Sequence, residues 1–163
     1  MARERKRISD SHFTLSALMG PQEANALGNV HGGVIMKMVD EVGALVAMRH
    51  AANLVVTIAI DSMTFLEPVL VGHLVMCSAE LTYVGRTSME VRVEVVTENP
   101  LHGDPKTTNT AYLVYVAIDS NGRPCEVPEI DFESPEQQIR AEHARERQAY
   151  RKQQRALEQP EQP

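Results

Sequence analysis

The polar residues best placed for chemistry lie in the short stretch from Asn29 to Asp40. Gly32 and Gly33 stand where a helix would begin, and glycine lets a substrate approach the backbone closely. The first amides of a helix have no acceptor inside the helix and carry partial positive charge, so they could bind the oxyanion that develops on an attacked carbonyl. Two glycines before a helix also suit a simple tight turn, and both interpretations stay open.

Asp40 is the unusual residue of this stretch, because it falls in the middle of an otherwise apolar helical run. A carboxylate taken out of water is costly unless it is paired or used. Lys37 is spaced to pair with Glu41 but could also reach Asp40, which would make Asp40 part of a structural ion pair. We favour the alternative, in which Asp40 is a general base for water or a nucleophile on a carbonyl carbon.

Asn29 and His31 are polar residues just before the helix. Asn29 either forms the turn and caps the helix, or holds a water or a carbonyl oxygen through its amide. His31 is either a second polar group of a site or a loop histidine without a chemical role. The candidate catalytic residues are therefore Asn29, His31, Gly33 and Asp40.

The spacing of these residues argues against a site built within one chain. Gly33 and Asp40 are seven helical steps apart, which is about 10 Å along the axis at the usual rise. Asp40 cannot easily share one water molecule with Asn29 or with the Gly33 amide of its own chain. Two such helices, antiparallel across a two-fold axis, would bring the start of one against the middle of the other. We therefore expect a dimer with two composite sites.

The sequence predicts one helix and five strands around these residues. The helix covers Val34 to Arg49 and is apolar on nearly every side, as expected of a helix enclosed by other structure. Apolar runs, most of them alternating, place the strands at residues 12–19, 54–60, 73–83, 89–96 and 109–118. Short turns between the later strands favour an antiparallel α+β fold over alternating βα units. A sheet curled around one central helix, the hotdog arrangement, satisfies both patterns.

Composition divides the chain into three parts. Residues 1–9 form a charged arm, residues 10–126 form the hotdog domain, and residues 127–163 form a tail rich in Glu, Gln, Arg and Ala. We expect this tail to be partly helical and solvated. The alternative is a helix that packs on a neighbouring subunit.

Charge and cysteine content narrow the class of protein. The formal net charge of −6 disfavours a nucleic-acid binder, although a local basic patch could still bind a small anion. Cys77 and Cys125 have neither disulfide nor metal-ligand spacing. The sequence shows no secretory signal and no run of about 18 apolar residues. We expect a soluble cytoplasmic protein without a metal or a membrane span.

The motifs taken together resemble the hotdog acyl-CoA hydrolases, a group with animal cytosolic and bacterial members. The resemblance covers roughly residues 10 to 125 and lies in Asn29-Val30-His31-Gly32-Gly33, Asp40-Glu41, residues 57–68 and residues 85–90. It implies hydrolysis of acyl-CoA to a fatty acid and free CoA, in fatty acid metabolism, without metal or prosthetic group. It also implies catalysis by Asn29 and Asp40 across a subunit interface.

The resemblance has two further implications. It places Arg86, Thr87 and Ser88 near the nucleotide of CoA, and an arginine at a turn is chemically suited to a phosphate. Many members assemble as trimers of dimers, so a homo-oligomer is expected here.

Two other functions compete with hydrolysis. A hydroxyacyl-thioester dehydratase of the same fold would need a His base facing a carboxylic acid, and His31 with Asp40 or Glu41 could serve. A non-catalytic acyl-CoA-binding regulatory module should carry an effector segment, and the acidic chain offers no clear one. Asn29 and the Asp40-Glu41 pair favour the hydrolase.

Overall fold

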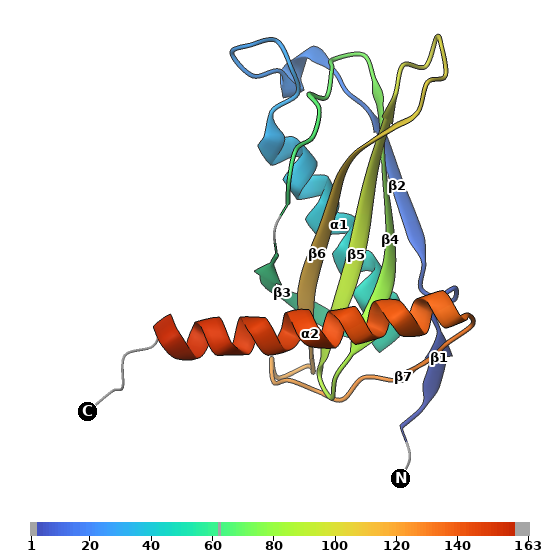
Figure 1. Cartoon of the computed structure of the whole chain (residues 1–163), viewed down its shortest axis with the longest axis vertical. Coiled ribbons are helices and arrows are strands. Elements are labelled where there is room, and N and C mark those ends of the chain that lie inside the picture. The colour runs from blue at the N-terminus through green and yellow to red at the C-terminus, as the bar shows by residue number, and fades with distance from the viewer. Residues whose placement is uncertain (1–2, 62, 159–163) are drawn as a thin grey trace.

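A curved sheet around one helix forms the centre of the molecule (Figure 1). The computed structural model describes residues 3–61 and 63–158. The sheet is antiparallel, in the order β2-β4-β5-β6-β3, and its concave face holds helix α1 (Gly32–Ala51). The strands are β2 (Phe13–Leu18), β3 (Leu54–Ile60), β4 (Leu74–Val84), β5 (Ser88–Glu98) and β6 (Lys106–Ile118). The predicted hotdog fold is confirmed.

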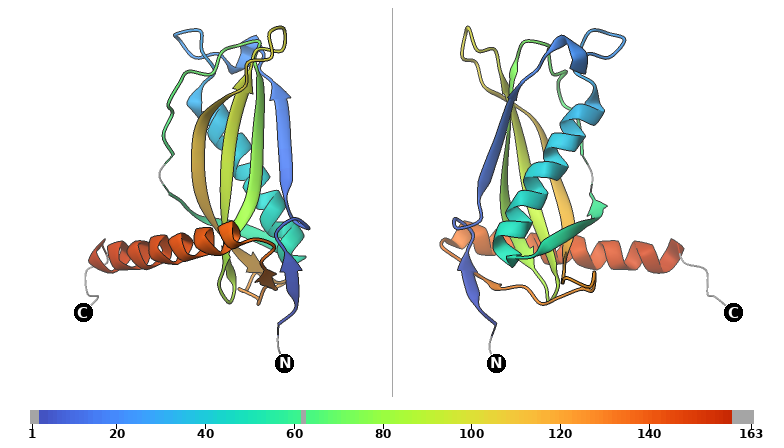
Figure 2. Two further views of the ribbon diagram at one scale, coloured as in Figure 1. Left: turned by 45° about the vertical axis from the view of Figure 1, so that its right-hand side comes forward. Right: turned by 180° about the vertical axis from the view of Figure 1, so that it is seen from behind.

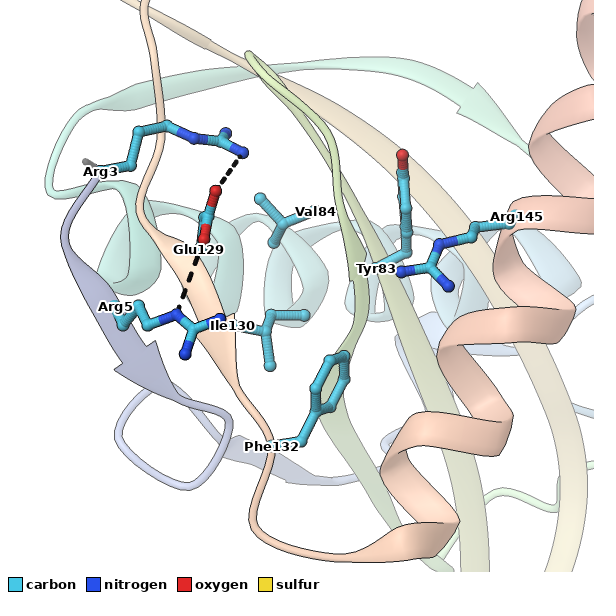
Figure 3. A pocket seen from close by; sticks show the side chains of 8 residues that line it. All are labelled: Arg3, Arg5, Tyr83, Val84, Glu129, Ile130, Phe132 and Arg145. Atoms are coloured by element: carbon cyan, nitrogen blue, oxygen red, sulfur yellow. Dashed lines mark hydrogen bonds and ion pairs between the residues drawn. The ribbon is translucent and has the colours of Figure 1, made fainter. Parts of the chain in front are cut away.

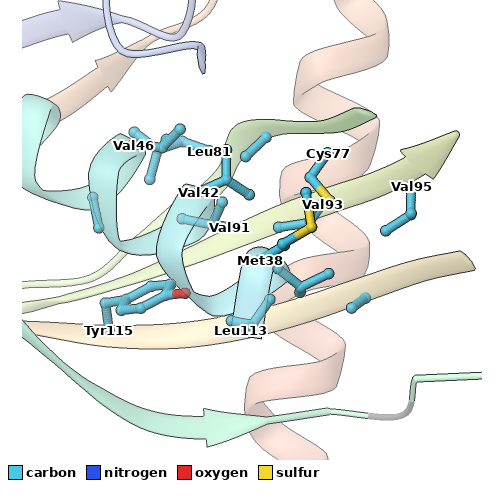
Figure 4. Close-up of a cluster of buried hydrophobic side chains, with 14 of the residues drawn as sticks. Met38, Val42, Val46, Cys77, Leu81, Val91, Val93, Val95, Leu113 and Tyr115 are labelled. Atoms are coloured by element: carbon cyan, nitrogen blue, oxygen red, sulfur yellow. The ribbon is translucent and has the colours of Figure 1, made fainter. Parts of the chain in front are cut away.

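Alternating side chains of the central strands build the core against α1. On β5, Val91, Val93 and Val95 are fully buried and face the helix (Figure 4). Val42 and Val46 of α1 are equally buried and meet them. Burial of these apolar side chains provides the main driving force that holds the helix on the sheet.

One flank of α1 is exposed in the single chain. The Met36 side chain is 43% exposed, and Lys37 and Glu41 lie in solvent. The prediction of a helix enclosed on every side is therefore wrong for one chain, because a single curved sheet covers only one side of a helix. An apolar exposed flank is a candidate surface for a partner.

The N-terminal arm is tied to the domain rather than free. Strand β1 (Arg5–Arg7) pairs in parallel with β7 (Glu129–Asp131) to form a second, two-stranded sheet. The Lys6 ammonium donates a hydrogen bond to the carbonyl of His50, the penultimate residue of α1, at 3.0 Å. Residues 5–7 of the predicted charged arm therefore form a strand that is fixed to the rest of the domain.

The tail is a long helix that crosses the outer face of the sheet, the face away from α1. This helix, α2 (Pro135–Glu158), buries Ala141 and Ala144 (Figure 2). Glu90, only 1% exposed on β5, accepts hydrogen bonds from Arg147 at 2.7 Å and from Arg151 at 3.1 Å. The expectation of a solvated tail is thus wrong for α2 as far as Arg151. Within the described ranges, no helix combines the length and apolar character that a membrane crossing requires.

Candidate active site

Asp40 lies on the side of α1 that faces β3 and β6. The Thr57 hydroxyl of β3 donates a hydrogen bond to Asp40 Oδ1 at 2.8 Å. The Tyr115 hydroxyl donates to the Asp40 carbonyl at 3.1 Å and lies 3.3 Å from Oδ1. Asp40 is half-buried, so the expectation of a deeply buried carboxylate is corrected.

The surroundings of Asp40 leave it available for chemistry. Among the described side chains, no cation lies within ion-pairing distance of Asp40, and Lys37 pairs instead with Glu41 at 3.6 Å. Burial, helped by the neighbouring carboxylate, raises the pKa of Tyr115 well above its ordinary value, so the phenol stays a neutral donor. The Thr57 and Tyr115 hydroxyls hold Asp40 Oδ1. In the described part of the chain, the other carboxylate oxygen, Oδ2, has no hydrogen-bond partner, so it is free to accept a proton from water.

His31 and Gly33 meet at the start of α1. The Gly33 amide donates to His31 Nδ1 at 3.0 Å, and the His31 carbonyl accepts from the Val34 amide at 2.9 Å. His31 therefore caps the helix in this structure. The imidazole must swing aside before the Gly33 amide can bind an oxyanion.

The start of α1 borders a cavity of about 270 Å³. Asn25, Asn29 and Gly32, the first residue of α1, all line it. The Asn25 side-chain oxygen accepts hydrogen bonds from the amides of Leu27 at 2.9 Å and Asn29 at 3.2 Å. These bonds fix the Asn25 side chain at the mouth of the loop. A Cβ at Gly32 would lie 3.3 Å from the Phe65 ring, so the helix start and Phe65 approach closely.

The predicted site residues fall into three separate groups in one chain. Asp40 does not line the cavity at the helix start, as the helical rise predicts. Arg86, Thr87 and Ser88 join β4 to β5 at the end of the sheet opposite to the start of α1 (Figure 1). The eleven residues of β5 span roughly 35 Å. One chain therefore does not bring its own three groups together.

The Arg86 turn presents an exposed cationic side chain. The Arg86 side chain is 79% exposed and its closest acidic neighbour, Glu126, lies 3.9 Å away. Backbone bonds hold the turn itself, since the Thr87 carbonyl accepts from Ala117 at 3.0 Å and the Ser88 carbonyl accepts from Gly85 at 2.8 Å. A rigid turn with an extended guanidinium is suited to an anionic ligand.

A second cavity, of about 260 Å³, lies between the N-terminal strand and α2 (Figure 3). Its arginines include Arg3 and Arg5, which both pair with Glu129. These two ion pairs neutralise charge on both arginines and hold β1 against β7. None of the predicted site residues lines this cavity.

Cys77 is not a nucleophile in this fold. The thiol is fully buried between α1 and the sheet, and burial raises its pKa to about 12. The thiolate is therefore absent near neutral pH.

Comparison with known proteins identifies the family. A family model described as thioesterase superfamily matches residues 27–102. A hexameric acyl-CoA thioesterase, solved without ligand, superposes with a TM-score of 0.90 at 36% identity and covers 94% of this chain and 99% of its own. The chain belongs to the hotdog acyl-CoA thioester hydrolases.

Other members of the family differ in length and in what is bound. The mouse cytosolic acyl coenzyme A thioester hydrolase is 39% identical over 77% of this chain, and the chain spans only 35% of that relative. The acyl-CoA hydrolase of Staphylococcus aureus is 31% identical, with a TM-score of 0.87 and 94% of each chain covered. That enzyme was solved with butyryl coenzyme A, coenzyme A and coenzyme A disulfide, and also as variants in which an asparagine, an aspartate or a threonine is replaced by alanine.

Sequence reasoning did not single out three polar residues that the structure places beside Asp40 or at the start of α1. Thr57 and Tyr115 reach Asp40 from strands that are distant in sequence, and no local pattern signals those contacts. Asn25 has a local signal, because its oxygen accepts from the amide two residues on, but that pattern is shared by ordinary turns.

Proposed function

We propose that this chain hydrolyses acyl-CoA to a fatty acid and free CoA. The observation that carries the proposal is Asp40, a carboxylate without an ion pair among the described residues, oriented by Thr57 and Tyr115 on an exposed flank of α1. The chain spans about a third of its mammalian relatives, so their activity does not by itself establish the activity of this chain.

The spacing of the replaced residues in the Staphylococcus aureus enzyme guides the assignment. Its asparagine is followed by the aspartate fifteen residues later and by the threonine seventeen residues after that. In this chain the same residue types have the same spacing at Asn25, Asp40 and Thr57. We therefore assign the amide role to Asn25 in place of Asn29. Asn29 then supports the loop, since its amide donates to Asn25 Oδ1 at 3.2 Å.

The site is composite, with groups from two subunits. Asn25 and the first amides of α1 from one chain face Asp40 of the partner, because within one chain the helical rise keeps them about 10 Å apart. The edge strand β3 supports such a dimer. Leu54 is 67% exposed, and Val56, Ile58 and Ile60 are each about 40% exposed. Pairing of two β3 edges across a two-fold axis would cover these side chains and the exposed flank of α1.

The chemistry follows from this geometry. Asp40 Oδ2 takes a proton from water while the water oxygen attacks the thioester carbonyl carbon. The Asn25 amide and the helix-start amides stabilise the oxyanion that forms, aided by the partial positive charge of the helix terminus. The C–S bond then breaks, the fatty acid leaves, and the CoA thiolate takes up a proton.

The remaining expectations belong to the same proposal. Arg86, with Thr87 and Ser88, binds the phosphates of CoA at the turn between β4 and β5, where the guanidinium is exposed. The chain assembles as a trimer of such dimers in the cytoplasm, and it uses no metal or prosthetic group. The hexameric assembly of the superposed thioesterase supports this oligomer.

A dehydratase receives no support from the geometry. Such an enzyme needs the His31 imidazole to face a carboxylic acid. In this structure the imidazole Nδ1 instead accepts a hydrogen bond from the Gly33 amide at the helix start. The hydrolase needs no such histidine.

Thiol release from a panel of acyl-CoAs of increasing chain length tests the proposal. Wild type should release thiol, and Asp40→Asn, which keeps the shape of the side chain but cannot accept the proton, should lose roughly a hundredfold or more in kcat. The matched control is Glu41→Gln, which alters the neighbouring exposed carboxylate and should stay active. Full activity of a folded Asp40→Asn variant would remove Asp40 from the mechanism.

A further inference from the structure

Arg3 connects the N-terminal arm to the turn that carries Arg86. Its guanidinium donates a hydrogen bond to the Gly85 carbonyl at 2.6 Å, although the two residues are eighty-two positions apart in the sequence. The same guanidinium donates to Glu129 Oε1 at 2.9 Å (Figure 3). The Arg3 side chain is half-buried. Arg3 therefore bridges strand β7 and the turn between β4 and β5.

The peptide groups on either side of Arg86 are both held by residues from outside the turn. The Gly85 carbonyl belongs to the peptide group that precedes Arg86, and it accepts the bond from Arg3. The Arg86 carbonyl belongs to the peptide group that follows, and it accepts from the Val127 amide at 3.1 Å. Because a peptide group is planar, holding both planes fixes the two backbone dihedral angles between them. These angles set the direction in which the Arg86 side chain leaves the backbone.

The segments that supply these two donors are fastened to the domain. Strand β1 pairs with β7, and the Glu129 amide donates to the Glu4 carbonyl at 2.8 Å. The Pro128 carbonyl lies 2.9 Å from Nε2 of His50, which is fully buried near the end of α1. The Arg86 turn is thus held against a part of the fold that is itself fixed.

The charges around Arg3 suit it to support the turn and not to bind an anion itself. Its guanidinium lies against the Glu129 carboxylate, which offsets the positive charge. Arg86, by contrast, is the exposed cation of the turn. Arg5 pairs with the same Glu129 at 3.6 Å, but among the described residues it donates to no carbonyl of the turn. Arg3 and Arg5 therefore differ in the one contact that reaches Gly85.

We propose that Arg3 positions the Arg86 turn to bind the nucleotide phosphates of CoA. The inference rests on the proposed function and adds to it a positioning residue from the N-terminal arm. A turn that is already fixed loses less conformational freedom when the phosphates bind, so the bond to Gly85 strengthens the binding of CoA. The thioester is at the other end of the substrate. Loss of the bond therefore raises KM and leaves kcat nearly unchanged.

Steady-state kinetics with two substrates test this role. One is an acyl-CoA, and the other is the acyl-pantetheine thioester with the same acyl group, which lacks the nucleotide. Arg3→Ala should raise KM for the acyl-CoA by about fivefold or more and keep kcat within about twofold, because only binding is weakened. Its KM for the pantetheine thioester should not change. Arg5→Ala, the matched control, should alter none of these values.

Three results would overturn the role of Arg3. The first is an unchanged KM for the acyl-CoA in folded Arg3→Ala, and the second is an equal rise for both substrates. The third is an equal rise in Arg5→Ala. Arg3→Lys keeps the charge but lacks the planar fork of the guanidinium, so it should fall between wild type and Arg3→Ala. If Arg3→Ala does not fold, a wild-type KM in Arg3→Lys would contradict the proposal.

A double variant shows whether Arg3 acts through Arg86. In an Arg86→Ala background, Arg3→Ala should cause no further rise in KM, because the side chain that it positions is absent. Additive effects would show that Arg3 acts by another route and would contradict the proposal.

Wild type keeps the two proposals apart. Folded wild type that releases no thiol from any acyl-CoA would refute the proposed hydrolase. Calorimetry with free CoA would then still test Arg3, since Arg3→Ala should weaken CoA binding by about fivefold or more. Normal hydrolysis by wild type together with an unchanged KM in Arg3→Ala would refute the role of Arg3 alone.

Discussion

At the scale of single residues, the position of Asp40 was predictable and its partners were not. A carboxylate inside an apolar helical run is visible in any sequence, because it contradicts the burial pattern around it. Thr57 comes seventeen residues later, in a nearly continuous apolar run that does not indicate which side chain contacts the middle of the helix. Tyr115 lies seventy-five residues away, and its place in an apolar strand indicates only an aromatic residue of the core. Such contacts depend on how the strands are placed across the helix.

The assignment of the amide role to Asn25 leads to a prediction that separates the two asparagines. Asn25→Ala should lower kcat strongly, because it removes a side-chain amide that lines the cavity at the helix start. Asn29→Ala should change kcat little, because the Asn29 backbone amide still donates to Asn25 Oδ1. Steady-state kinetics with one acyl-CoA, with folding checked by circular dichroism, compares the pair. The reverse order of effects would return the role to Asn29.

At the scale of elements, the longer units were predictable and the short ones were not. The predicted helix from Val34 to Arg49 becomes Gly32–Ala51, and the predicted strand at residues 54–60 has the observed bounds. These elements carry enough apolar residues for a periodic signal. Strands β1 and β7 have three residues each and form only by pairing with each other. Helix α2 is held on the sheet by the buried Ala141 and Ala144 and by Arg147 and Arg151 on Glu90, and the highly charged composition of the tail gave no sign of these contacts.

At Gly43, α1 and the sheet approach closely, and this approach supports a stability prediction. A Cβ there would collide with the Tyr115 hydroxyl. Gly43→Ala should therefore destabilise the protein by about 1–2 kcal/mol in urea unfolding, because overpacking outweighs the better helix propensity of alanine.

The same collision supplies the control for Gly43→Ala. In a Tyr115→Phe background the hydroxyl is gone, and the cost of Gly43→Ala should fall by at least half. Equal costs in the two backgrounds would show that the tyrosine hydroxyl does not set the spacing between α1 and β6.

At the scale of the whole molecule, the decisive feature is that one chain holds the parts of a site without bringing them together. Asp40 lies at mid-helix, Asn25 lies at the helix start, and the Arg86 turn lies at the far end of the sheet. The edge of β3 and one flank of α1 are apolar and exposed, and in the proposed dimer a second copy covers both. The helical rise predicted this separation from the sequence alone, since seven residues of helix fix the distance.

Mixing two inactive variants tests the composite site most directly. Asn25→Ala and Asp40→Ala subunits are combined, exchanged by mild denaturation and refolding, and assayed for thiol release, with exchange confirmed by mass spectrometry of differently tagged chains. If the site is shared across the two-fold axis, each mixed dimer holds one site with both lesions and one intact site, so activity should recover to about a quarter of wild type at equal mixing. Activity that stays at the level of the separate variants, after exchange is demonstrated, would show that each site is built within one chain.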